Sequence, residues 1–214
     1  MIENARTWLG QRSIRNYLKI NKRSVKACNL QEAKSIGILF NATHQVSFEI
    51  VKALVKDISN RKNSVEVLGY VDSKQLIDHY LYRKGFEFFT QAQLNWYYKP
   101  IEANVQKFIE QPFDILIDLS LDDPFPIHYI IACSQAKFKV GRYYEGQDCL
   151  DFMIDMEKEK EAMERIRDEL NKDLKEKKKD NKEVEKIVDK KAQTEIQLNF
   201  LINQLIHYLS LINK

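Results

Sequence analysis

FDILIDLSLDDPFPIHYIIACSQAKFKVGRY, residues 113–143, is the stretch of sequence that decides the fold. It begins with a run rich in isoleucine and leucine from 113 to 119, a composition typical of a buried strand. The turn-forming segment SLDDP at 120–124 follows, and an apolar segment of helix length leads to a second strand candidate at 139–141. Strand, turn, helix and strand form one βαβ unit, so the sequence predicts an α/β fold.

Short apolar runs alternate with helical patterns upstream of this unit as well. Strands that are separated by helices pair in parallel through right-handed crossovers. We therefore expect a Rossmann-like, mostly parallel sheet with helices on both faces. A helix is predicted from Ser73 to Gly85, and the upstream strands are predicted at Ser35–Phe40, Ser64–Val71 and Phe86–Phe89, with Asn95–Tyr98 as a further candidate.

The chain of 214 residues has room for one domain with appendages. We predict a basic N-terminal helix within residues 1–26 and an α/β core over 27–154. Residues 155–191 are mostly charged, with balanced signs, and predict a coiled-coil-like helical hairpin; partial disorder is the alternative. The apolar residues 192–214 predict a C-terminal helix that packs on the core.

The N-terminal segment has an uneven charge, with seven basic residues against one acid in residues 1–26. An amphipathic helix of this composition can bind phosphate backbones or an anionic membrane surface. The alternative, which we favour, is a helix that docks on the sheet by its apolar stripe and leaves its arginines solvated. The candidate contact residues are Arg6, Arg12, Arg15, Lys19, Lys22 and Arg23.

The predicted carboxyl ends of the strands carry polar residues, and α/β proteins bind ligands at that edge of the sheet. The candidate ligand-binding residues are Asn41, Asp72, Ser120, Asp122 and Asp123. For the last two, capping of the following helix is the favoured use. The aromatic residues from 80 to 98 could form a stacking platform, but few basic residues are interleaved with them, so packing in the core is favoured.

No spacing in the sequence points to catalysis. The glycine-rich phosphate loops and the GxSxG pattern do not occur, and the four histidines are scattered singly. We expect no catalytic residue, no metal site and no cofactor, and we interpret the three cysteines as reduced thiols. Because we find neither a signal-peptide pattern nor an apolar run long enough to span a bilayer, we expect a cytoplasmic location.

Several motifs carry a resemblance to known families. The order SIGILF, LGYVD, FDILIDLS, IIACSQAKFKVGRY, DFMID and LINQLIHYL, spread over residues 30–213, resembles an uncharacterised family from Bacteroidota that is known as a domain of unknown function. The strand ending in Asp118-Leu119 and the later Lys139-Val140-Gly141 also resemble the N-terminal Rossmann-like half of heptosyltransferase-type glycosyltransferases. In those enzymes a second domain holds most of the donor nucleotide, and this chain has no room for it.

The leading functional prediction is therefore a non-catalytic α/β interaction or adaptor protein with a protein partner. One alternative is an RNA- or ribosome-associated factor that uses the basic N-terminal helix. Another is a degenerate glycosyltransferase-like domain that binds a nucleotide or nucleotide sugar at the carboxyl ends of the strands. The oligomeric state is left open.

Overall fold

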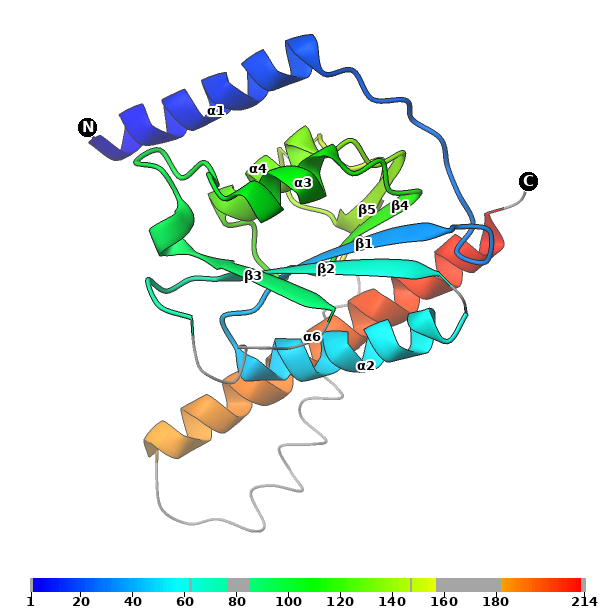
Figure 1. The fold of residues 1–214 in the computed structure, drawn as a ribbon. Helices are drawn as coiled ribbons and strands as arrows, with labels where there is room; N and C mark the ends of the chain where they lie inside the picture. The colour runs from blue at the N-terminus through cyan, green and yellow to red at the C-terminus, as the bar shows by residue number, and fades with distance from the viewer. Residues whose placement is uncertain (1, 62, 77–84, 147, 157–181, 213–214) are drawn as a thin grey trace, which may run out of the picture.

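The computed structural model describes residues 2–61, 63–76, 85–146, 148–156 and 182–212. In this part of the chain, six strands form one sheet in the order β3-β2-β1-β4-β5-β6, and every neighbouring pair is parallel (Figure 1). The predicted α/β class with a parallel sheet is confirmed. The strands are β1 (Ser35–Asn41), β2 (Ser64–Val71), β3 (Phe86–Thr90), β4 (Ile115–Asp118), β5 (Phe138–Arg142) and β6 (Phe152–Ile154).

Helices cover both faces of the sheet (Figure 1). Helices α2 (Gln45–Ser59) and α6 (Lys182–Leu211) lie on one face and bury one hydrophobic cluster. Helices α3 (Ala103–Glu110) and α4 (Phe125–Cys133) lie on the other and bury a second cluster. Helix α1 (Ile2–Ile20) lies over α4, on the side away from the sheet.

Strand β4 shows why the opening stretch decides the fold. It lies in the middle of the sheet between β1 and β5, and all four of its residues are buried. Ile115 and Ile117 face the α2–α6 layer, whereas Leu116 faces the α3–α4 layer. A strand covered on both faces is apolar on both sides, and Ile115, Leu116 and Ile117 follow that pattern; Asp118, at the carboxyl end of the strand, departs from it.

Helix α6 is continuous from Lys182 to Leu211, so residues 182–191 of the charged segment run directly into the apolar C-terminal residues. Its inner stripe, Leu198, Leu201, Leu205 and Leu209, is buried against α2 and the sheet. Residues 157–181, which make up most of the predicted hairpin, lie outside the described residues.

Three local predictions need correction or lie partly outside the description. Asn95–Tyr98 is a tight turn and not a strand, because the Tyr98 N–H donates back to the Asn95 carbonyl. The residue that caps the N-terminus of α4 is Pro124, which makes no side-chain capping bond, so neither Asp122 nor Asp123 caps that helix. Of the helix predicted from Ser73, residues 73–76 are not helical, and residues 77–84 are not described.

The last feature of the helices is their length and hydrophobicity. Within the described residues, none of them is both long enough and apolar enough to cross a bilayer.

Candidate functional site

The strand order reverses direction between β1 and β4, and in open α/β sheets ligands bind at the carboxyl edge near such a point. Four of the five predicted ligand-binding residues lie there. The Asn41 amide donates to both carboxylate oxygens of Asp122, at 3.1 and 3.0 Å, and so links the ends of β1 and β4. This pair holds the two loops together across the reversal point.

Behind this pair, Asp118 and Ser120 are fully enclosed. The Ser120 N–H donates to Asp118 Oδ1 at 3.0 Å, and the Tyr144 hydroxyl donates to the Ser120 carbonyl at 2.9 Å. Burial raises the pKa of Asp118 to about 7, and repulsion from Asp123 and Asp122 adds to the rise, whereas hydrogen bonding from Ser120 opposes it. Asp118 is therefore a carboxyl group that exchanges its proton near neutrality.

Asp123 faces His128 of α4, with 3.5 Å between its Oδ2 and the histidine Nδ1. Ser120 has no exposed surface, and Asn41, Asp122 and Asp123 make the contacts given above. These four residues form a polar cluster at the ends of β1 and β4, in which Asn41 bonds to Asp122, Ser120 to Asp118, and Asp123 faces His128.

Asp72, the fifth predicted residue, lines a separate hollow next to this cluster. We call it the edge hollow; it has a volume of about 660 Å³ and opens at the carboxyl ends of β2 and β3. That volume falls in the range of small-molecule sites. Its aromatic walls are Tyr70, Trp96, Tyr98 and Phe125, and its polar and charged lining is Arg6, Asp72, Lys74, Gln91 and Asn95.

The Asp72 carboxylate is held in place from two sides. The Tyr70 hydroxyl donates to Asp72 Oδ1 at 2.8 Å, and the Gln91 amide donates to the same oxygen at 2.7 Å. The backbone N–H of Asp72 donates to the Thr43 hydroxyl, which fixes the main chain as well. Burial, followed by the bond to Asp72, raises the pKa of Tyr70, so this phenol remains a proton donor.

The far wall of the edge hollow is the loop from Asn95 to Lys99, which we call the aromatic loop. The Asn95 side-chain oxygen accepts from the N–H groups of Tyr97 and Lys99, at 3.1 and 3.0 Å. Tyr98 has a φ of +64°, the one positive value among described residues other than glycine. Such a backbone costs of the order of 1–3 kcal/mol and is concentrated at functional sites.

Arg6 connects the aromatic loop to α1. Its Nε donates to the Trp96 carbonyl at 2.7 Å, its Nη1 donates to the Tyr98 hydroxyl at 2.9 Å, and its guanidinium lies 4.6 Å from the centre of the Tyr98 ring. Figure 1 shows the segment between β3 and α3 reaching up to the start of α1. A residue predicted as a nucleic-acid contact is thus part of the wall of the hollow.

Helix α1 docks by its apolar stripe on α4, and not on the sheet, where the favoured alternative placed it. Ile14 is buried in the α3–α4 cluster, and Tyr17 packs against it. At Gly10 the two helices approach so closely that a Cβ atom would lie 2.3 Å from the Phe125 ring. Because Phe125 also lines the edge hollow, the position of α1 sets the shape of that hollow.

We expect Gly10→Ala to lower the free energy of unfolding, although alanine is the better helix former by about 1 kcal/mol. The added methyl group collides with Phe125, and overpacking of this kind costs about 1–3 kcal/mol. Urea denaturation measures the effect. Asn16→Ala, at an exposed position of the same helix, is the control and should stabilise. If both changes stabilise, α1 does not dock as closely as described.

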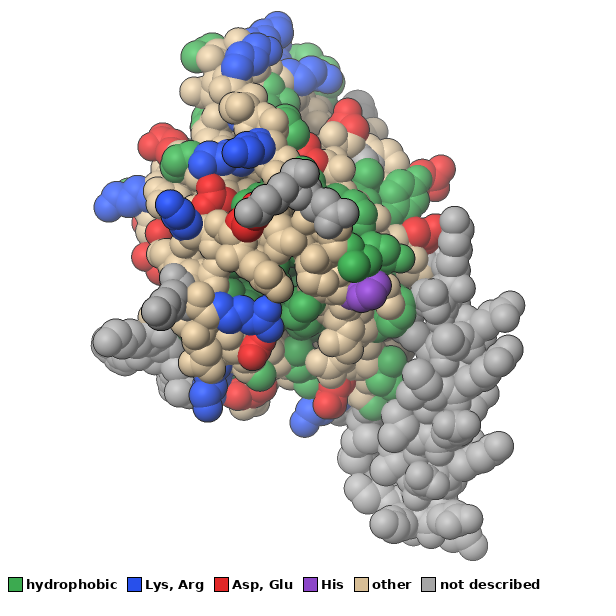
Figure 2. All heavy atoms as spheres, turned by 90° about the vertical axis from the view of Figure 1, so that its right-hand side faces the viewer, with side chains coloured by type: hydrophobic (Ala, Val, Ile, Leu, Met, Phe, Trp, Pro, Cys, Tyr) green, Lys and Arg blue, Asp and Glu red, His purple; other side chains and the backbone are tan. Residues whose placement is uncertain are grey.

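The outer side of α1 is basic. Arg12, Arg15 and Lys19 are exposed, and Lys22 beyond the helix end is exposed as well. Figure 2 shows Lys and Arg side chains gathered at the top of the molecule, where α1 lies. We call these four residues the basic face. Arg23 does not belong to it, because its guanidinium forms a salt bridge with Asp151 at 2.5 Å.

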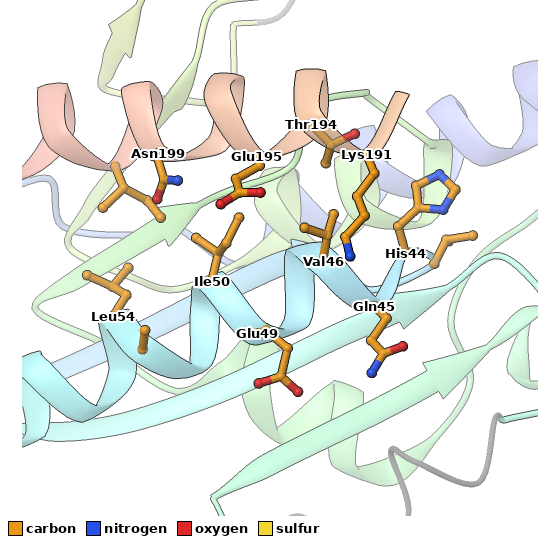
Figure 3. Close-up of a pocket in the computed structure, with 13 residues that line it drawn as sticks. His44, Gln45, Val46, Glu49, Ile50, Leu54, Lys191, Thr194, Glu195 and Asn199 are labelled. Atoms are coloured by element: carbon orange, nitrogen blue, oxygen red, sulfur yellow. The ribbon is translucent and has the colours of Figure 1, made fainter. Parts of the chain in front are cut away.

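A second hollow, of about 1060 Å³, lies between α2 and α6. Figure 3 shows Val46, Ile50 and Leu54 along its α2 side, with Lys191 reaching toward α2 from α6. Glu49 and Glu195 are exposed residues of its lining. This groove has an apolar floor and a charged rim.

The described residues include no group of three or more His, Cys, Asp or Glu side chains placed to share a metal ion. Cys28, Cys133 and Cys149 are free thiols, and burial raises the pKa of Cys133 to about 11 and that of Cys149 to about 12. Both groups are therefore poor nucleophiles near neutrality.

A comparison with protein-family models matches residues 6–176 to the model described as "Family of unknown function (DUF6913)". The chain belongs to DUF6913. This confirms the predicted membership of a family of unknown function, although the match begins earlier and ends earlier than residues 30–213. The DUF6913 match includes α1 from Arg6 onward and all six strands, so the edge hollow and the basic face both lie within it. Neither the search of curated proteins nor that of solved structures found a match.

Sequence reasoning missed most of the edge hollow. The aromatic concentration at 80–98 was the available signal, and packing in the core was favoured for it. That interpretation holds for Phe89, which is buried, and for Phe86 and Phe88, which pack against the core. It does not hold for Trp96, which is 53% exposed. The arginine that such a platform needs comes from α1, and no local pattern could reveal that.

Proposed function

We propose that this chain is a non-catalytic interaction protein whose partner is single-stranded RNA, bound along the basic face of α1. The observation that carries the proposal is the charge of the N-terminal segment. Residues 4–31 contain seven basic residues and no acid, and four of the seven form an exposed group on and just beyond one helix. A surface of this kind attracts a phosphate backbone through release of counterions.

The way α1 docks favours a nucleic acid over a membrane. A helix that binds a lipid surface inserts its apolar face between the headgroups. Here that face is already occupied, because Ile14 is buried and Tyr17 packs in the cluster beneath α4. On its solvent side α1 exposes Arg12, Arg15 and Lys19, together with the apolar side chains of Trp8, Leu18 and Ile20. The row of cations suits phosphates in solution.

Exposed tryptophans add the second component of a single-strand site. Trp8 is 52% exposed and lies on the same side of α1 as Arg12, whose guanidinium is 5.3 Å from the indole centre. Trp96 is equally exposed, in the aromatic loop that Arg6 ties to α1. Stacking of a base on an aromatic ring contributes about 1–3 kcal/mol and tolerates any sequence.

The test is fluorescence anisotropy with a short unstructured RNA as a function of salt. Four phosphate contacts on a single strand predict a slope of about −3 in log K against log salt, or a loss of about 60-fold from 50 to 200 mM. Arg12→Gln with Arg15→Gln should reduce the slope to about half, because two contacts are lost.

The matched control is Lys34→Gln with Lys56→Gln, which removes the same charge from exposed positions away from α1. It should leave the slope unchanged. The proposal is wrong if the chain does not bind RNA at low salt, or if both double variants weaken binding equally. Vesicles of anionic lipid and acidic polypeptides are run in parallel; tighter binding to either would replace RNA as the partner.

A second candidate function is binding of a free nucleotide or nucleotide sugar at the carboxyl ends of the strands. It is favoured by the edge hollow, where Asp72 is fixed among aromatic walls. The resemblance to a glycosyltransferase half-domain pointed to the same edge of the sheet. An adaptor role toward another protein would use the same basic face, and the parallel measurement with acidic polypeptides separates that role from RNA binding.

A further inference from the structure

We infer that the edge hollow is a binding site for one ribonucleoside unit, with Asp72 accepting a hydrogen bond from a ribose hydroxyl and Trp96 stacking on the base. This inference deepens the proposed RNA function, because the unit can belong to a strand that continues along α1. The same chemistry is offered by a free ribonucleotide. The experiment below separates these two sources.

The position of Asp72 points to ribose. It follows β2 directly, at the carboxyl edge of the sheet and beside the point where the strand order reverses. In sheets of this architecture, an acidic residue near that position hydrogen-bonds a ribose hydroxyl. The local contacts of Asp72 point to a hydroxyl ligand independently of the fold.

Those contacts prepare one carboxylate oxygen for a ligand. Tyr70 and Gln91 both donate to Asp72 Oδ1, and no described residue donates to Oδ2. A carboxylate fixed by two donors keeps its orientation when a third group arrives, so little ordering is needed on binding. A hydroxyl donor is the matching chemistry, because an ionised carboxylate only accepts.

The walls suit a planar ring with a phosphate attached. The Trp96 indole is half exposed at the rim, whereas one face of Tyr98 is covered by the Arg6 guanidinium. Lys74, two residues beyond Asp72, is exposed and lines the same hollow. Arg6 and Lys74 make the rim cationic, which favours a phosphate on the sugar.

The turn after β1 limits the ligand to one such unit. Dinucleotide sites place a pyrophosphate on a glycine-rich turn at this point. Here the turn is Asn41-Ala42-Thr43-His44, and Ala42 is completely buried while Asn41 is bonded to Asp122. The main chain of this turn therefore cannot come close to a pyrophosphate.

Trp96 gives a direct readout, since Trp8 and Trp96 are the two tryptophans of the chain. In a Trp8→Phe protein the fluorescence reports on Trp96 alone. Ribonucleoside monophosphates, their 2′-deoxy forms, and an RNA and a DNA oligomer of one sequence are titrated in turn. We expect quenching by ribose-containing ligands, and a preference over the deoxy forms of about tenfold or more, as for a hydrogen bond to a charged group.

Asp72→Asn should bring the RNA-to-DNA ratio close to one and leave the salt slope unchanged. Tyr70 and Gln91 hold the remaining side-chain oxygen, so an NH2 donor replaces the accepting Oδ2, and no phosphate contact is lost. Asp148→Asn, at an exposed position outside the hollow, should keep the ratio of the natural chain. Quenching by free monophosphates identifies a free nucleotide as a ligand, and quenching by RNA alone identifies a strand.

The inference is overturned if no ribose-containing ligand quenches Trp96, or if Asp72→Asn keeps the preference for ribose. That failure differs from failure of the proposed function. If the natural chain shows no preference for ribose but its RNA affinity keeps the expected salt slope, only the inference about the hollow is wrong and the RNA proposal stands. If monophosphates quench Trp96 but no oligomer binds, the hollow is a site for a free nucleotide and the RNA proposal is wrong.

Discussion

Replacing Leu201 with alanine is expected to lower the free energy of unfolding by about 2–5 kcal/mol, the range for a fully buried leucine. Leu201 has no exposed surface and lies in the cluster that α2, α6 and the sheet share. The change removes three carbon atoms from a packed interior and leaves a cavity. It does not weaken the helix itself, since alanine is the best helix former.

Leu211→Ala is the matched control for this experiment. Leu211 belongs to the same helix but is 56% exposed, so its replacement should change stability by no more than about 0.5 kcal/mol. Urea denaturation of both variants, with equal m-values, compares them directly. Equal and small losses in the two variants would mean that α6 is not part of the core.

Asp118→Asn is expected to stabilise the chain at about pH 8, by as much as about 4 kcal/mol, and to have little effect near pH 4. The folded-state pKa of about 7 lies above the ordinary value of 3.8. Between these values the unfolded chain releases a proton that the folded chain retains, so stability falls as pH rises, by about 1.4 kcal/mol per unit. Asparagine is neutral throughout and retains the oxygen that accepts from Ser120.

Denaturation midpoints across this pH range test the prediction. Asp57→Asn, which replaces an exposed carboxylate on α2, serves as the control. Its difference from the natural chain in free energy of unfolding should not rise between about pH 4 and about pH 8. A stabilisation of Asp118→Asn that is equal at both ends of the range would show that the carboxyl group does not titrate near neutrality.

The sheet was predictable because each strand carries its own signal. Residues 115–117 and 36–40 contain no polar side chain, as expected of a strand covered on both faces. The strand order β3-β2-β1-β4-β5-β6 was not predicted, since it depends on contacts between distant segments. The turn at Asn95 was missed for a related reason: a run of aromatic residues indicates a strand, but one asparagine side chain holds this run in a loop.

The candidate site was predictable only in part. Asp72 and the other four residues were found because polar residues after an apolar strand mark the carboxyl edge of a parallel sheet. Their division into a closed polar cluster and an open hollow depends on side-chain bonds such as Asn41 to Asp122. Arg6 and Arg23 illustrate the same limit: both were predicted as surface cations, and both make contacts with residues about 90 or more positions away.

The bond between Arg6 and Trp96 joins residues 90 positions apart, and this separation has a consequence for the order of folding. At a synthesis rate of 5–20 residues per second, roughly 5–20 s pass between the appearance of Arg6 and that of its partner. During that interval the ribosome has not yet synthesised the aromatic loop, which Arg6 of α1 contacts, or α4, which covers the apolar stripe of α1. Assembly of the edge hollow is therefore a late event in the life of a nascent chain, and partially folded molecules lack it.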